Sequence, residues 1–580
     1  MKHRGARVFW VMALVLGLAV FACAGPKKLT ILHTNDTHSA MVPFETGFIP
    51  AVGADPQLNP GVGAGLWNVW HFPYNQEYAG IARMATLIKK LRVQDPNVLA
   101  LHAGDVFVGS FEFNKYLGCP ELKIMESLYD VMELGNHEFD LGINVLAAVL
   151  NGQIAGGAPV GLPVICANVN FGGTSLQGMI QPSFVKTVGG VKVGIIGIVS
   201  QEPQNYTDEV NTRFPYPYEG SPGTTLWDHV GELAYTLKNG QEKCDVVICL
   251  SHIGTGLDVM ALSQVPYIDV IVGGHSHDVY AEPKIVERKD SNGNVIGRVI
   301  IVHAGESGKY LGELKLAIDA GVISLESWTP IRVDGKIKED PKVRAAVNQV
   351  RSGVIADPRF GQVYDARIAW ALRDILKDWP ETGPNRDTAL GNLVTDAFRN
   401  RLTKAGFGVD CALDALGYLG ADIYAGKVVG NNILGAVPYG YDEATGLDFK
   451  VVVVPLTGQL LIGGLEYAAD NVTLTTDLSI QASGLTYTYD SSKDLESRVD
   501  PASVLVNGEP VAAHLDKVYY VAMSDRVYGF LAALVAEQTG GQLKLPSIPT
   551  GLNEYTIVRD YMKSLRFVRY QSEGRIKDTK

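Results

Sequence analysis

Residues 29–38 read LTILHTNDTH and residues 97–105 read NVLALHAGD, with the segment GIARMATLIKKLR (80–92) between them. The two outer segments contain short apolar runs that predict strands, and the middle one has apolar residues at helical spacing. Alternation of strand and helix is typical of layered α/β domains. The stretch therefore predicts an α/β domain in the first half of the chain.

The same alternation continues to about residue 319. A helix is expected at 121–129, and further apolar runs occur at 131–134, 162–166, 191–199, 244–250, 268–273 and 297–303. Asp, Asn and His residues follow directly after several of these runs. Because ligands of α/β proteins bind at the carboxyl ends of strands, we expect a functional site there.

The second half begins with a stretch that looks helical, over residues 340–379. Its two apolar-periodic segments are VRAAVNQVRSGV (343–354) and IAWALRDILKDW (368–379), and Asp340-Pro341 has the composition of an N-cap and first turn. A second α/β segment follows, with helices expected at 388–402, 458–470 and 555–565 and strands at 449–456 and 517–524.

The N-terminus has the pattern of an export signal. Lys2, Arg4 and Arg7 precede an uncharged apolar run, Val8–Phe21, that is shorter than the roughly 20 residues of a spanning helix. Residues 1–24 are thus predicted to be a signal peptide or lipoprotein leader, cleaved after Ala24 or lipidated at Cys23. We expect an exported protein of the periplasm or cell envelope, which lipidated Cys23 would tether to a membrane.

Composition narrows the classes of partner. The chain has 580 residues and a net charge of -12, so it would repel nucleic-acid polymers. A small anionic substrate would have to be attracted locally, by metal ions. The six cysteines show no CxxC spacing and predict no disulfide framework, with a single bridge left open. Cys166, Cys244 and Cys249 lie in or beside apolar runs and are expected to be buried thiols. The stretch 39–78 lacks periodicity and is interpreted as a long inserted loop, either a substrate-side lid or a packed surface excursion.

Five short motifs carry the predicted chemistry, each after an apolar run. They contain Asp36 and His38; Asp105; Asn136, His137 and Asp140; His252; and His275 and His277. Two divalent ions about 3.5–4 Å apart need a bridging carboxylate and mixed oxygen and nitrogen ligands, and Asp105 is the natural bridge. The DxH and HxH motifs are expected to be extended, so that alternate residues in each lie on one face. Carboxylate, amide and imidazole ligands suit Zn, Mn, Co or Fe.

These motifs, LTILHTNDTH, AGD, GNHEFD, SHIGTG and GGHSH, resemble the metallophosphoesterase domain of the 5′-nucleotidase family. The resemblance implies one metal held by Asp36, His38, Asp105 and His277, and a second held by Asp105, Asn136, His252 and His275. It also implies that His137, paired with Asp140, acts on the phosphoryl group beside the metals. The implied fold is an N-terminal αββα metallophosphoesterase sandwich (29–325), a helical linker (340–379) and a C-terminal α/β substrate domain (380–570).

The C-terminal half departs from the family pattern at its substrate contacts. The family's phosphate-binding Asn and Arg fall on Ala415 and Gly420, and a further Arg falls on Pro384, where Arg386 is a nearby substitute. Tyr439 takes the place of a base-stacking Phe. The second aromatic segment is altered, and Tyr528 and Phe530 are the candidates to replace it.

The resemblance therefore implies a dinuclear-metal phosphoesterase that hydrolyses phosphomonoesters with a metal-activated hydroxide. The favoured substrates are 5′-nucleotides or related nucleotide derivatives. The alternatives are a phosphoesterase for non-nucleotide esters and a metal-containing binding protein with little turnover. The sequence leaves the oligomeric state open.

Overall fold

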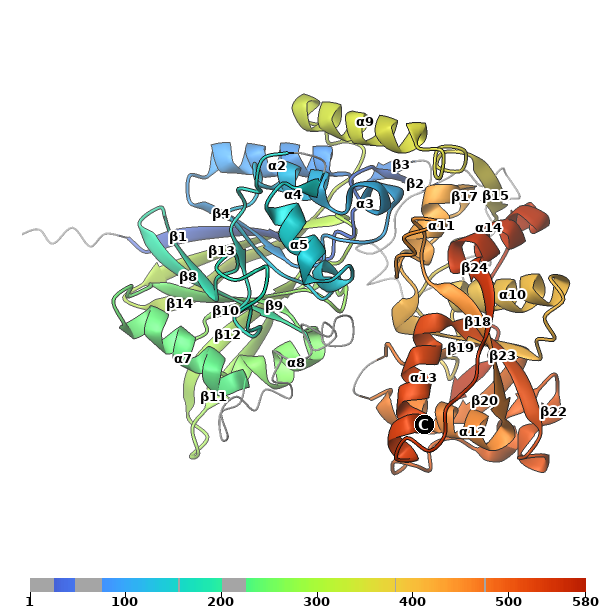
Figure 1. The fold of residues 1–580 in the computed structure, drawn as a ribbon. Coiled ribbons are helices and arrows are strands. Elements are labelled where there is room, and N and C mark those ends of the chain that lie inside the picture. Colours follow the sequence, from blue (N-terminus) through green and yellow to red (C-terminus); the bar gives the residue numbers. More distant parts are fainter. Residues whose placement is uncertain (1–24, 47–75, 155–156, 201–225, 381, 474–475) are drawn as a thin grey trace, which may run out of the picture.

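The computed structural model describes residues 25–46, 76–154, 157–200, 226–380, 382–473 and 476–580. The predicted leader (1–24) with Cys23, and the central part of the predicted insertion (47–75), lie outside these residues. Figure 1 shows two α/β domains side by side, with helix α9 (Pro341–Ala356) running along the top.

Two six-stranded sheets form the centre of the N-terminal domain. One has the order β14 (Val322–Arg332), β13 (Tyr310–Asp319), β1 (Lys27–Thr34), β4 (Val98–Ala103), β5 (Val131–Glu133), β6 (Val164–Ile165). The other has the order β11 (Lys284–Lys289), β12 (Val295–His303), β10 (Val270–Gly273), β9 (Val246–His252), β8 (Val191–Val199), β7 (Ser183–Val188). A buried cluster that includes Ile31, Leu101, Ile248 and Val272 combines residues of both sheets and lies between them.

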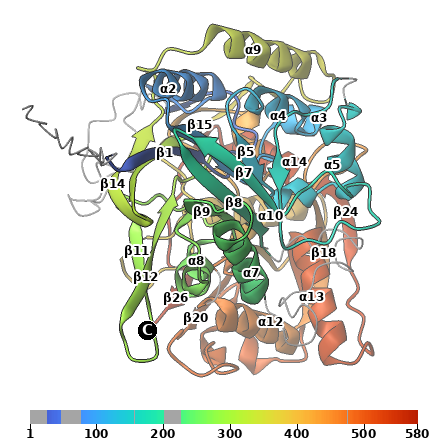
Figure 2. The ribbon, with the colours of Figure 1, turned by 90° about the vertical axis from the view of Figure 1, so that its left-hand side faces the viewer.

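Helices cover the outer faces of both sheets (Figure 2). They are α2 (Ile81–Gln94), α3 (Phe111–Tyr116), α4 (Cys119–Met125) and α5 (Ile143–Leu150) on one side, and α7 (Leu226–Asn239) and α8 (Thr255–Met260) on the other. The predicted αββα sandwich is thereby confirmed. Strands β1, β4 and β5 run parallel, as do β8, β9, β10 and β12, so the loops after several strands meet at one end of the sandwich.

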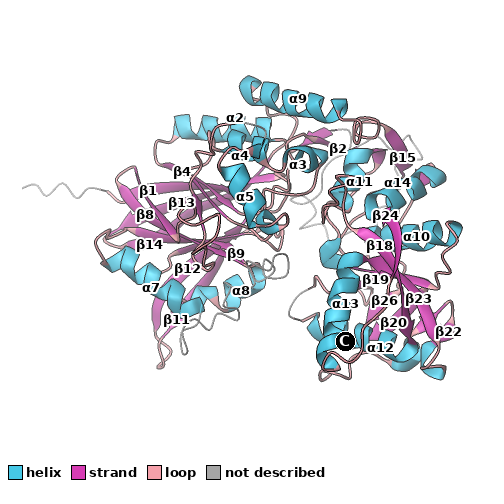
Figure 3. Cartoon of the chain, viewed as in Figure 1, coloured by secondary structure: helices cyan, strands magenta, loops and turns pink. Residues whose placement is uncertain are grey.

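The C-terminal domain is built on a five-stranded sheet, and Figure 3 shows helices on both sides of it. The sheet order is β19 (Ile480–Ser483), β16 (Cys411–Ala415), β23 (Val518–Ser524), β18 (Lys450–Thr457), β24 (Ile548–Asn553). The helices are α10 (Ala389–Lys404), α11 (Gly430–Ala436), α12 (Gly458–Asn471), α13 (Asp525–Gln538) and α14 (Glu554–Leu565).

Three smaller sheets complete the structure. They are β17 (Gly426–Val429), β15 (Arg367–Ala371), β25 (Phe567–Val568); β22 (Glu509–Pro510), β21 (Leu505–Val506), β20 (Leu485–Tyr489), β26 (Ile576–Asp578); and β2 (Phe44–Thr46), β3 (Gln76–Tyr78). The last pair joins the two described ends of the inserted stretch as an antiparallel ladder.

The predicted helical linker over 340–379 is only partly right. Helix α9 begins where expected, and the Asp340 side chain accepts hydrogen bonds from the backbone of Lys342 and Val343. The second expected helix, 368–379, is wrong: residues 367–371 are strand β15, which pairs with β17 and β25. Pairing with two strands that are distant in sequence outweighs local helix propensity there.

Helix α9 is attached to the N-terminal domain at both ends. Lys89 of α2 contacts Asp340 at 2.7 Å, and Lys115 of α3 contacts Asp357 at 2.7 Å. Val343 and Val347 of α9 belong to the core of the N-terminal domain. The chain therefore crosses between the domains after α9, over residues 357–366.

Each domain places one aromatic side chain in the core of the other domain. Phe111 of α3 is fully buried in the core of the C-terminal domain, where its ring lies 5.0 Å from that of Phe360 and 5.4 Å from that of Tyr555. Tyr439 of the C-terminal domain belongs in turn to the core of the N-terminal domain.

Five cysteines lie within the described residues, and all are buried free thiols. Burial of Cys166, Cys244 and Cys249 is as predicted, and the single bridge left open by the sequence is not formed among these five. Across the described part of the chain, no helix has the length and hydrophobicity needed to cross a membrane.

Candidate metal centre

The seven predicted ligands lie where strands of the two sheets end. Asp36 and His38 follow β1, Asp105 follows β4 and Asn136 follows β5. His252 is the last residue of β9, and His275 and His277 follow β10. Parallel strands bring these ends together, so residues up to 241 positions apart in the chain meet at one place, as the contact between His277 and Asp36 shows.

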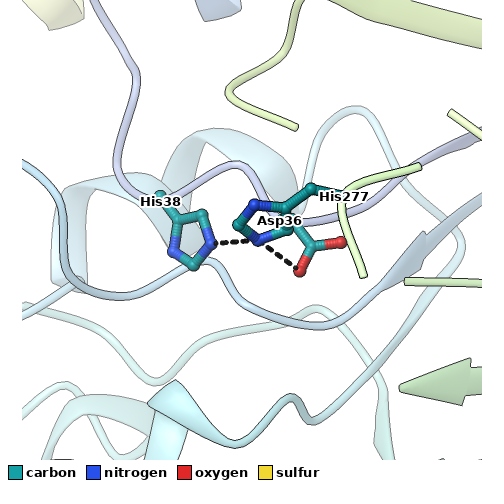
Figure 4. Close-up of side chains that lie close together, drawn as sticks. All are labelled: Asp36, His38 and His277. Carbon is teal, nitrogen blue, oxygen red and sulfur yellow. Dashed lines mark hydrogen bonds and ion pairs between the residues drawn. The ribbon is translucent and has the colours of Figure 1, made fainter. Parts of the chain in front are cut away.

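Asp36, His38 and His277 form the first group of potential ligands (Figure 4). Their ligand atoms all lie within 4.8 Å of one another. The Nε2 atoms of His38 and His277 are 3.1 Å apart, and Nε2 of His277 lies 3.4 Å from Oδ1 of Asp36. Two imidazole nitrogens that face each other beside a carboxylate are an arrangement that a divalent cation fits.

Asp105, His252 and His275 form the second group, again within 4.8 Å of one another. Nε2 of His252 lies 2.9 Å from Oδ2 of Asp105. Oδ1 of Asn136 lies 3.1 Å from both Nε2 of His252 and Nδ1 of His275, so the amide oxygen joins this group.

The second ring nitrogens of His252 and His277, which point away from the two ligand groups, support the same interpretation. Nδ1 of His252 donates to the backbone oxygen of Ala103 at 2.6 Å, and Nδ1 of His277 faces Oε2 of Glu306 at 3.0 Å. Metal-binding histidines typically bond their second nitrogen to a carbonyl or carboxylate, which fixes the ring so that the other nitrogen faces the metal. The side chains present therefore fit two divalent cations.

The local backbone differs from the extended form assumed for the DxH and HxH motifs. Asp36, His38, His275 and His277 have φ angles of 48°, 45°, 73° and 58°, and Asp105 has 58°. These are left-handed conformations in tight turns after the strands, and they are costly for residues other than glycine. The side chains converge because of these turns rather than because alternate strand residues share a face.

Opposite charges within the cluster shift the pKa values of its carboxylates and imidazoles. Burial acts against ionisation of Asp36, but His277 and His252 outweigh it and lower the pKa of Asp36 to about 2. Burial likewise opposes protonation of His252, while Asp105 and Asp36 raise the pKa of His252 to about 10. The site thus concentrates carboxylate charge that cations can neutralise.

Glu138 is a functional residue that the sequence reasoning missed, although it lies inside the GNHEFD motif. Its carboxylate accepts backbone N–H groups of Asp105, Val106, Phe107 and Gly135 at 2.6–3.1 Å. It therefore fixes the turn that carries Asp105 to the turn that carries Asn136. Gly135 belongs to the same contact, since a Cβ there would lie 2.0 Å from Oδ1 of Asp105.

His137 and Asp140 pair beside the cluster. Nδ1 of His137 donates to Oδ2 of Asp140 at 2.8 Å. Burial lowers the pKa of His137, but the charges of Asp140 and Asp105 outweigh it and raise the pKa to about 9.

Tyr439 reaches this pair from the C-terminal domain. Its ring stacks on that of His137, with centroids 4.6 Å apart and planes 10° from parallel. Only 5% of Tyr439 is exposed.

Arg526, the second residue of α13, was not singled out from the sequence, yet its charge acts on the pair. Burial raises the pKa of Asp140, while the charges of His137 and then Arg526 oppose that rise. No periodicity or motif in the sequence marks Arg526.

The other predicted substrate residues make contacts within the C-terminal domain. Arg386 lies 3.7 Å from Asp578 and over the ring of Trp379. The Tyr528 hydroxyl donates to Leu545 O at 2.8 Å, and Phe530 packs on Tyr467. The structure thus brings Tyr439 to the metal cluster, whereas the described contacts of Arg386, Tyr528 and Phe530 are elsewhere.

The turn that lacks the expected phosphate ligands is closely packed. Ala415 is 4% exposed and borders a cavity of about 60 Å³ with predominantly apolar walls. A Cβ at Gly420 would lie 2.3 Å from the backbone oxygen of Gly435. An arginine would therefore not fit at position 420 without a shift of the backbone.

Two family models match the chain. The model of calcineurin-like phosphoesterases matches residues 29–279, and the model of the 5′-nucleotidase C-terminal domain matches residues 377–529.

Similar proteins extend over almost the whole chain. The 5′-nucleotidase of Diplobatis ommata is 28% identical over 95% of this chain and 90% of its own length, and the human 5′-nucleotidase is 28% identical over 100% and 95%. The crystal structure of a 5′-nucleotidase precursor from Thermus thermophilus has a TM-score of 0.72, with 26% identity over 95% of this chain and 99% of the other.

Proposed function

Because the chain belongs to the 5′-nucleotidase family of metal-dependent phosphoesterases, we propose that it hydrolyses nucleotide phosphomonoesters at the cluster around Asp105. The observation that carries the proposal is the convergence of two ligand groups at the strand ends. Nearly full-length similarity to 5′-nucleotidases supports the substrate class.

In this proposal two divalent metal ions would share Asp105. Asp36, His38 and His277 would hold the first, and Asn136, His252 and His275 would hold the second. When bound, such ions lower the pKa of water and offset negative charge on a phosphoryl group. Zn, Mn, Co and Fe all suit this set of ligands.

His137 acts beside the metals as an acid and as a charge-stabilising group. The hydrogen bond from Nδ1 to Asp140 fixes the orientation of the ring. Nε2 is then the atom that donates to the phosphoryl oxygens and the leaving oxygen. The negative charge of Asp140 and Asp105 favours the protonated imidazole that this step needs.

The proposal includes export. Residues 1–24 have the composition of a signal peptide or lipoprotein leader, which supports a location in the periplasm or cell envelope, on a membrane if Cys23 is lipidated. Cleavage after Ala24 and lipidation at Cys23 give N-termini that mass spectrometry of the exported protein distinguishes.

A substrate panel tests the function. Purified protein loaded with Mn or Zn is given nucleoside monophosphates, UDP-sugars, cyclic nucleotides and glycerol 2-phosphate, and phosphate release is measured. We expect turnover of at least one nucleotide class, with loss of activity in a chelator. Turnover of glycerol 2-phosphate alone would contradict the nucleotide assignment.

One observation favours a second candidate, a phosphoesterase for non-nucleotide esters. Ala415 and Gly420 replace the polar groups expected to hold the phosphate of a nucleotide, and the packing around Gly420 has no room for an arginine. The same panel distinguishes the two candidates.

A further inference from the structure

Tyr439 was expected to stack on the base of a substrate, yet its ring lies on a catalytic side chain. The ring centroids of Tyr439 and His137 are 4.6 Å apart and the planes are nearly parallel. Two stacked layers need roughly 7 Å, so no base fits between these rings. On this face, Tyr439 contacts the imidazole of the N-terminal domain.

We propose that Tyr439 is a positioning residue through which the C-terminal domain holds His137 in its working orientation. The inference rests on the proposed function. Tyr439 fixes the plane of the imidazole, and Asp140 holds Nδ1 of the same ring. The catalytic pair is therefore complete only when the two domains are in contact.

The energetic scale is sufficient for a kinetic effect. Stacked aromatic rings attract each other beyond the area that they bury. Loss of alignment of about 1 Å at a reacting group can lower a rate by roughly 100-fold. A modest stacking energy thus has a large effect when it decides the orientation of an acid.

Two substrates separate positioning from base binding. Wild type, Tyr439→Leu and Tyr439→Phe are loaded with Mn, and kcat and KM are measured with AMP and with glycerol 2-phosphate, which has no ring. For Tyr439→Leu we expect kcat to fall about tenfold or more with both substrates. We expect Tyr439→Phe, which keeps the ring, to have a kcat close to that of wild type. A raised KM for AMP, with unchanged kcat for glycerol 2-phosphate, would show that Tyr439 serves the base and would overturn the inference.

Tyr467→Leu is the matched control. Tyr467 is a partly buried tyrosine of α12 in the same domain and packs on Phe530. We expect this variant to keep wild-type kcat with both substrates. An equal loss in Tyr467→Leu would assign the effect to general destabilisation of the domain.

A measurement without turnover keeps the inference distinct from the proposed function. Diethyl pyrocarbonate modifies accessible imidazoles, and mass spectrometry locates the modified residues. We expect His137 to react at least several-fold faster in Tyr439→Leu than in wild type and Tyr439→Phe. Equal rates of modification would overturn the stacking role even if no phosphoester is hydrolysed. If wild type hydrolyses no phosphoester but its His137 reacts slowly with diethyl pyrocarbonate, only the proposed function is contradicted.

Discussion

The backbone at the metal cluster is strained at individual residues. Five potential ligands, Asp36, His38, Asp105, His275 and His277, have φ between 45° and 73°. Each left-handed residue other than glycine costs about 1–2 kcal/mol. The strands and the hydrogen bonds of Glu138 hold these turns in place, so the cluster is preformed at the expense of stability.

The first prediction separates two roles at this cluster. Asp105→Ala removes the carboxylate expected to be shared and should lower occupancy at both metal sites. His137→Ala should leave the metals bound and lower turnover by roughly 10²- to 10⁴-fold, because a positioned acid is lost. Metal analysis of the two purified variants checks this. Equal metal content in both would contradict the division of roles.

A second prediction concerns Gly135. In Gly135→Ala the new Cβ would lie 2.0 Å from Oδ1 of Asp105, so the carboxylate or the turn must move. We expect loss of metal and of turnover. Gly256→Ala is the matched control, since a Cβ at Gly256 meets no atom within 4 Å. Wild-type metal content in Gly135→Ala would show that the turn can adjust.

At the scale of elements, most strands and helices could be predicted because each has a clear apolar pattern. Strand β15 could not. Residues 368–379 carry apolar side chains at helical spacing, but Ala369 and Ala371 alternate inwards once residues 367–371 pair with β17 and β25. The partner strands lie 55 or more residues away, and a local pattern contains no information about them.

The candidate site could also be predicted only in part. Its ligands could be chosen from sequence because each short motif follows a strand. The left-handed turns could not, because DxH and HxH have no residue that demands φ above zero. The contact of Tyr439 with His137 joins residues about 300 positions apart. Such contacts follow from how the domains pack.

Helix α9 leads to a third prediction, on stability. The Asp340 side chain accepts N–H groups of Lys342 and Val343 at 3.1 and 3.0 Å. Asp340→Ala should lower the free energy of unfolding by about 1 kcal/mol, and Asp340→Asn by less than half of that, because asparagine also caps helices. Thermal melting compares the two. Equal losses would mean that the ion pair with Lys89 matters more than the cap.

The other end of α9 gives a prediction for pH. Hydrogen bonds from Arg359 lower the pKa of Asp357, and Lys115 adds to the effect. A lowered carboxyl pKa stabilises the fold above the unfolded value of about 3.9, and this stability is lost as pH falls through the folded value.

Wild type should therefore exceed Asp357→Asn by roughly 1–2 kcal/mol at pH 7. The difference should shrink only below about pH 4. Urea unfolding at several pH values measures it, and a difference that persists unchanged at the lowest pH would contradict the ionic origin.

At the scale of the whole molecule, the domains are joined by the reciprocal insertion of Phe111 and Tyr439. Phe111→Ala empties a fully buried site between Phe360 and Tyr555 and should cost about 3–5 kcal/mol. We also expect a larger radius of gyration in X-ray scattering, because the domains lose an anchor. The radius of gyration of Phe111→Leu should lie between those of wild type and Phe111→Ala. An unchanged radius would mean that the remaining contacts hold the domains together.

The position of Phe111 has a consequence for biosynthesis. Its aromatic neighbours are residues 360, 364 and 555, so the ribosome completes that pocket only near the end of translation. Until then, the nascent metal domain carries an exposed aromatic side chain on α3, a natural target for a holdase chaperone. An isolated fragment that ends with α9 would keep this apolar surface permanently. Expression of the metal domain alone should therefore give a protein that aggregates, and substitution of Phe111 by a polar residue is the change that would make the fragment soluble.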